Sequence, residues 1–132
     1  MTKPKRIDRE GPIHRSVLDY LRKTLPGAMI HHSPNERDMR GVSAMRQIAK
    51  ARDLGTVKGW PDIEILWRGH FWTMEVKAEG QYAKPEQREV GAAIIAAGGR
   101  WAVVRSIDDA AECVAEWRGD ATADIPLIGV IS

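Results

Sequence analysis

Two short apolar runs on either side of Arg68 and Gly69 constrain the fold of this chain more than any other feature. In "DIEILW" and "HFWTMEV" apolar residues alternate with others, as in strands with one buried face. A two-residue connection between such runs is typical of a β-hairpin. With Arg68 and Gly69 as the turn, Trp67 lies opposite His70 and one face is apolar. Its residues are Ile63, Ile65, Trp67, Trp72, Met74 and Val76.

The other face of this hairpin carries charge. In the same register Asp62 lies opposite Glu75, and Lys77 shares the face of Glu75. Opposed residues have Cβ atoms ~4.5–5.5 Å apart, where like charges are destabilising. A divalent cation would explain the pair, since Mg²⁺ is commonly held by one or two carboxylates. Lys77 would then point toward the same substrate. A solvated strand face, on which Lys77 offsets nearby acids, is the alternative, and the residues alone leave both open.

Helical and strand patterns alternate along the rest of the chain. Apolar spacing predicts a first helix ending near Leu25, and Pro85 and the Gly98–Gly99 pair bound another. Ser106 and Asp109 have capping-box spacing and predict a last helix that ends near Trp117. A further helix is expected from Ser43. With strands at 28–33, 62–67, 70–78 and 100–106, the order predicts an α/β fold: a mixed sheet with helices on both faces.

Length and composition fit a single domain. The chain has 132 residues, of which 43% are hydrophobic and 29% charged, so neither disorder nor a fibrous repeat is indicated. We expect a core over residues 10–118 and a tail over 119–132 that adds an edge strand or contacts a partner copy. No run approaches the ~20 apolar residues of a membrane span, and the N-terminus lacks the apolar centre of a secretory signal, so we expect a cytoplasmic protein. The single Cys113 fits a small core residue.

Charge is unevenly distributed along the chain. Residues 1–60 hold 13 Lys and Arg against 6 Asp and Glu, whereas residues 61–132 hold 7 against 12. The first part is the one that would face a polyanion, although a solvated surface explains the asymmetry equally well. The basic residues in question are Arg37, Arg40, Arg46, Lys50, Arg52 and Lys58.

Four sequence segments together resemble a known family. "GWPD", twelve residues, then "EVK", followed by "KPEQ" and "GGRWAVVRS", resembles the VRR-NUC branch of the PD-(D/E)XK nuclease superfamily, from about Glu10 to Trp117. The resemblance implies a restriction-endonuclease-like core, roughly αβαββαβα. It also implies cleavage of a nucleic-acid phosphodiester that depends on Mg²⁺ or Mn²⁺.

The resemblance also implies roles for residues of the hairpin. Asp62 and Glu75 would bind the metal, with the Val76 backbone carbonyl as a further ligand. Lys77 would orient the attacking water or stabilise charge on the phosphate. Gln87 matches the glutamine of the helix after the lysine strand; its alternative is an ordinary polar residue of a first turn.

Glu10 stands where a first-helix glutamate often completes the site in this family, but Gly11 and Pro12 follow at once. Asp8 as a cap would keep Pro12 in the first turn, where a missing N–H is tolerated. A surface acid at a helix start is the alternative for Glu10. His31 and His32 are adjacent on a strand and point to opposite faces, so a structural or DNA-facing role fits them better than one shared ion. Tyr82 and Lys84 are candidates for substrate contact.

The resemblance implies that the basic residues bind DNA. They would neutralise its phosphates, and such contacts position the DNA without reading its sequence. No zinc-finger or recognition-helix signature is evident, which favours recognition by shape. Chains of this size in the family resemble junction-resolving enzymes that act as homodimers. We therefore expect an endonuclease for branched DNA such as Holliday junctions; the alternative is a non-catalytic nucleic-acid-binding or assembly module with the same fold.

Overall fold

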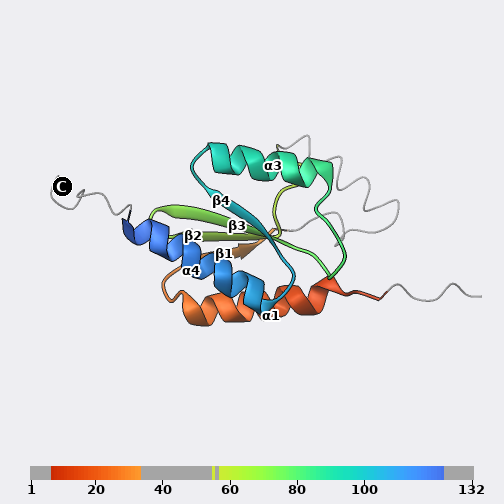
Figure 1. Cartoon of the computed structure of the whole chain (residues 1–132), viewed down its shortest axis with the longest axis horizontal. Coiled ribbons are helices and arrows are strands. Elements are labelled where there is room, and N and C mark those ends of the chain that lie inside the picture. The colour runs from red at the N-terminus through yellow and green to blue at the C-terminus, as the bar shows by residue number, and fades with distance from the viewer. Residues whose placement is uncertain (1–6, 34–54, 56, 124–132) are drawn as a thin grey trace, which may run out of the picture.

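Four strands form one mixed sheet with helices on both of its faces (Figure 1). The computed structural model describes residues 7–33, 55 and 57–123. The sheet order is β1-β2-β3-β4, in which β1, β2 and β3 are antiparallel and β3 and β4 are parallel. The elements are α1 (Glu10–Thr24), β1 (Met29–His32), β2 (Ile63–Trp67), β3 (His70–Val76), α3 (Pro85–Ala96), β4 (Arg100–Val104) and α4 (Ile107–Ala123).

The hairpin of β2 and β3 has the predicted register. Ile63 pairs with Met74 and Trp67 pairs with His70, which leaves Arg68 and Gly69 as the turn. Both turn residues have positive φ, 47° at Arg68 and 83° at Gly69, as in a type I′ turn. The twist of this turn matches the twist of the strands. A one-residue slip would exchange the two faces, so the register decides which side chains the helices cover.

The apolar face of the sheet packs against α1 and α4, which lie together on one side in Figure 1. The six predicted apolar residues of the hairpin are all buried in this core, together with Val17 and Leu21 of α1 and Val114 and Trp117 of α4. Cys113 is partly buried against the same core, as predicted. Burial, followed by the nearby Glu116, Asp109 and Glu112, raises the pKa of its thiol to about 11. It is therefore a neutral packing residue at physiological pH.

The last helix is longer than the sequence predicts. The predicted helix ended near Trp117, but α4 continues to Ala123, through Gly119. Ala121 is buried in the core, and Asp120 forms an ion pair with Arg100 of β4 at 2.9 Å. These tertiary contacts outweigh the poor helix propensity of glycine. Residues 119–123 are thus helical; the rest of the predicted tail, 124–132, and the helix predicted from Ser43 lie outside the described residues.

Helix α3 covers the second face of the sheet, opposite α1 and α4 (Figure 1). Its Gly91 lies on the ring of Trp101 in β4, where a Cβ would come within 2.3 Å of the indole. Near its start, Gly59 (φ +86°) lies against the backbone of Glu86, and a Cβ there would be 2.6 Å from the Glu86 carbonyl oxygen. The segment that leads into Asp62 is therefore packed directly on the first turn of α3. No helix in the described part of the chain is long and apolar enough to cross a membrane.

Candidate active site

Asp62 lies one residue before β2, at the end of the hairpin remote from the turn. Its side chain is 1% exposed, and its Oδ2 accepts the backbone N–H of Val76 at 2.8 Å. Its own carbonyl oxygen accepts the N–H of Ser33, just past β1, at 2.9 Å. The carboxylate is therefore held against the end of β3, beside the position that the predicted register gives to Glu75.

Glu75 is 2% exposed and contacts the helix above it. Gln87 Nε2 of α3 donates to Glu75 Oε1 at 2.9 Å, while Gln87 Oε1 accepts the N–H of Lys84, the N-cap residue of α3, at 2.7 Å. Because the amide oxygen is engaged by the cap, the amide nitrogen is directed toward Glu75. Gln87 thus ties the start of α3 to a carboxylate of the hairpin, which the sequence pattern did not specify.

Lys77 follows β3 on the side of the sheet that Glu75 occupies, and it is 8% exposed. Its N–H donates to the carbonyl of Val104 in β4 at 3.0 Å. A trans peptide directs N–H and C=O in opposite directions, so the Val76 carbonyl points away from β4 and toward Asp62. Asp62, Glu75 and Lys77 therefore lie at one end of the hairpin, remote from its turn. All three charged side chains are buried, so the alternative of a solvated strand face is wrong.

These donors fit a small, hard cation. Mg²⁺ and Mn²⁺ prefer carboxylate and carbonyl oxygens, and Mg²⁺ keeps several waters or substrate oxygens in its shell. Within residues 7–33, 55 and 57–123, no group of three or more His, Cys, Asp and Glu side chains is placed to hold a metal. Asp62, Glu75 and the Val76 carbonyl would therefore form a sparse set, completed by water and phosphate.

Glu10 is the first residue of α1, half-buried. Arg9 is the N-cap residue of α1, and Asp8, one residue before it, accepts the N–H of Gly11 on its Oδ1 at 2.9 Å, so Asp8 satisfies a donor of the first turn, in which Pro12 also lies. The structure does not gather Glu10 with Asp62 and Glu75 into a three-carboxylate cluster. Its place in the site stays a prediction.

The two adjacent histidines diverge, as strand geometry predicts. His31 Nδ1 lies 3.3 Å from Glu64 Oε1 on the face of Asp62, whereas the ring of His32 packs edge-on against His14 of α1, with centroids 4.5 Å apart. Glu64 also accepts a hydrogen bond from the hydroxyl of Ser33. The histidines therefore do not share an ion.

The loop between β3 and α3 is contacted by a residue that sequence reasoning missed. Arg105, directly after β4, donates from Nη2 to the Gln81 carbonyl at 2.6 Å, and its guanidinium lies 5.5 Å from the centroid of the Tyr82 ring. The contact follows from the parallel pairing of β3 and β4, which brings the residues after both strands to the same end of the sheet, and the sequence pattern did not specify this pairing. Tyr82 and Lys84 are exposed, and so is Lys58, whose Nζ lies 3.9 Å from Glu86 Oε1.

Five of the predicted DNA-binding residues lie outside the described residues. They are Arg37, Arg40, Arg46, Lys50 and Arg52. Their role stays a prediction from charge and resemblance.

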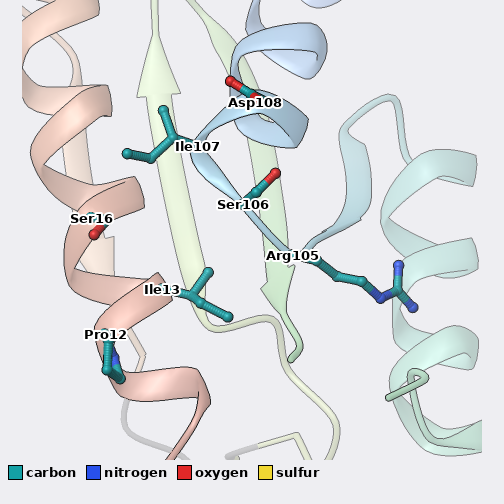
Figure 2. A pocket seen from close by; sticks show the side chains of 7 residues that line it. All are labelled: Pro12, Ile13, Ser16, Arg105, Ser106, Ile107 and Asp108. Atoms are coloured by element: carbon teal, nitrogen blue, oxygen red, sulfur yellow. The ribbon is translucent and has the colours of Figure 1, made fainter. Parts of the chain in front are cut away.

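An open pocket of about 360 Å³ lies between α1 and the start of α4 (Figure 2). Its lining is mainly apolar and includes neither Asp62 nor Glu75. Figure 2 shows the Arg105 side chain extending away from the other lining residues, toward α3. The pocket residues are Pro12, Ile13, Ser16, Arg105, Ser106, Ile107 and Asp108. Because none of Asp62, Glu75 and Lys77 lines it, this pocket does not coincide with the candidate site at the hairpin end.

The mixed four-stranded sheet with helices on both faces has a restriction-endonuclease-like α/β fold, and comparison with solved structures specifies this fold further. The chain superimposes on a "VRR_NUC domain protein" with a TM-score of 0.64 at 21% identity, over 85% of this chain and 89% of that one. A second structure, a "VRR_NUC domain", gives 0.57 at 20% identity over 82% and 96% of the two chains. No family model and no curated protein sequence matches. The chain therefore has the fold of VRR_NUC domains, as the sequence resemblance implied.

Proposed function

We propose that this chain is a VRR-NUC nuclease, an endonuclease that hydrolyses phosphodiester bonds in structured DNA with Mg²⁺ or Mn²⁺. The observation that carries the proposal is the burial of Asp62, Glu75 and Lys77 at one end of the β2–β3 hairpin. The VRR_NUC fold supports it, because the chain has that fold and its sequence carries the PD…ExK pattern at these three residues.

The energetics favour a site over a structural role. Removing a charged group from water costs several kcal/mol unless it is paired or coordinates a metal, and like charges opposed across a hairpin add to that cost. A protein that only had to fold would gain stability from apolar residues at these positions. The arrangement is therefore best explained by a function that needs the charges.

The residues of this chain would position the metal, the attacking water and the phosphate. Asp62, Glu75 and the Val76 carbonyl would hold the metal, which when bound lowers the pKa of water and polarises the phosphate. Lys77 would orient the attacking water or neutralise charge on the phosphate oxygens. Gln87 keeps Glu75 Oε1 in place through its 2.9 Å hydrogen bond, so it acts as a positioning residue.

For the substrate we propose branched DNA such as a Holliday junction, bound by a homodimer and recognised by shape. Backbone contacts from the basic first part of the chain would supply affinity without sequence reading. Two copies would present two sites to two strands. These finer points rest on the charge distribution and on the resemblance.

A non-catalytic nucleic-acid-binding module is the second candidate. The observation in its favour is that no group of three or more potential His, Cys, Asp or Glu ligands lies in the described part of the chain. This candidate, however, gives the buried Lys77 no role.

A substrate panel separates the two functions. The protein is incubated with labelled Holliday junction, flap, duplex and single-stranded DNA in Mg²⁺, Mn²⁺ or EDTA. We expect cleavage of the branched DNA that EDTA abolishes. Binding without products in either metal would select the non-catalytic module instead.

A further inference from the structure

Tyr82 is a large aromatic side chain that the fold leaves in solvent beside the candidate site. It is 77% exposed, so it contributes little to the core. It lies in the loop that joins β3 to α3, five residues after Lys77 and five before Gln87. Its backbone is thus tied at both ends to residues of the site.

Arg105 holds this loop and one face of the ring. Its Nη2 donates to the carbonyl of Gln81, and its guanidinium lies 5.5 Å from the Tyr82 centroid, within the ~6 Å of a cation–π contact. Arg105 follows Val104, whose carbonyl accepts the N–H of Lys77. The exposed ring and its cation therefore lie at the end of the sheet where Lys77 follows β3, and Figure 2 shows the Arg105 side chain extending toward α3.

We propose that Tyr82, supported by Arg105, is a stacking surface for an unpaired nucleobase next to the phosphate that is cut. An exposed aromatic ring accepts the face of any base, and an adjacent guanidinium adds attraction for both the base and its phosphate. Bases inside a duplex are already stacked on their neighbours and cannot use the ring. The pair would therefore make the enzyme favour DNA with unpaired bases at the cleavage point, an inference that rests on the proposed nuclease function.

The test compares two DNAs that differ only in pairing. One is a fully paired duplex and the other is the same duplex with a short single-stranded gap. Cleavage in Mg²⁺ gives KM and kcat for each, and fluorescence anisotropy in EDTA gives binding without cutting. The variants are Tyr82→Ala, Tyr82→Phe, which keeps the ring, and Ile95→Ala, which removes another exposed apolar side chain, on α3.

We expect Tyr82→Ala to weaken binding of the gapped DNA and raise its KM by about fivefold or more, with kcat and duplex binding little changed. Tyr82→Phe and Ile95→Ala should behave as wild type. An equal loss on both DNAs, or none, would overturn the stacking role even though the protein still cuts. If wild type cuts neither DNA but binds the gapped one through Tyr82, the stacking surface stands and the nuclease proposal fails.

Discussion

Single residues at the end of the hairpin carry the chemical argument. Asp62 and Glu75 are 1% and 2% exposed, yet each is engaged on one oxygen by a donor from a neighbouring element. Such bonds fix the orientation of a carboxylate and leave it able to act as a ligand. The site is thus built by positioning buried charges, and its sensitivity to single substitutions should be high.

Neutral replacements of the two acids should abolish cutting. Asp62→Asn and Glu75→Gln keep size and most hydrogen bonds but lose the negative charge that would bind the metal. We expect cleavage to fall by about a hundredfold or more, since even outer-shell partners of a metal are worth about 10–100-fold. DNA binding in EDTA should survive. Glu64→Gln, on the same strand face, is the control; equal losses in all three variants would dissociate the cutting from these two acids.

Gln87→Ala should weaken the apparent affinity for Mg²⁺ in cleavage although it removes no proposed metal ligand. The substitution frees Glu75 from its 2.9 Å partner, so we expect about a tenfold rise in the Mg²⁺ concentration for half-maximal cleavage. A saturating Mg²⁺ concentration should restore much of the rate. The titration distinguishes positioning from folding, because a folding defect would lower the rate at every Mg²⁺ concentration.

Elements, rather than residues, determine which faces meet. The alternation within β2 and β3 was sufficient to predict the register and the apolar face, because side-chain direction in a strand follows from local geometry. The predicted end of α4 was wrong, because the helix is extended by the burial of Ala121 in a core that residues distant in sequence form. The contact between Arg105 and the loop at Gln81 could not be predicted for the same reason.

Two glycines in different elements should respond oppositely to alanine. Gly69 has φ +83° in the hairpin turn, where an alanine is strained, and Gly69→Ala should lower the free energy of unfolding by about 1–2 kcal/mol. Gly119 lies inside α4 with open space around it, so Gly119→Ala should raise it by about 0.5–1 kcal/mol. Urea denaturation of both variants measures the difference. Shifts of the same sign would contradict the assigned turn or helix.

At the scale of the whole molecule, sequence and structure agree on the architecture. The mixed sheet between α3 and the α1–α4 pair matches VRR_NUC structures although identity is only 20–21%. Fold survives such divergence because buried patterning is conserved in kind while residue identities change. The site was predicted from the motif, but its burial and its link to α3 required the three-dimensional packing.

The proposed homodimer can be examined directly. A junction-resolving enzyme needs two sites, so light scattering at micromolar concentration should give twice the 14.7 kDa of the chain, alone or with junction DNA. A monomer under both conditions would refute the dimer while leaving the cleavage proposal in place.

The close approach of Gly59 to the first turn of α3 has a consequence for sequence variation. A Cβ there would lie 2.6 Å from the Glu86 carbonyl oxygen, and φ is +86°. At Gly80, φ is +80° but the space around it is open, so asparagine, which tolerates this conformation, fits there. Position 59 should accept only glycine, because any Cβ would meet the Glu86 backbone. In a library covering every amino acid at both positions, folded variants should therefore carry only glycine at 59 but glycine or asparagine at 80.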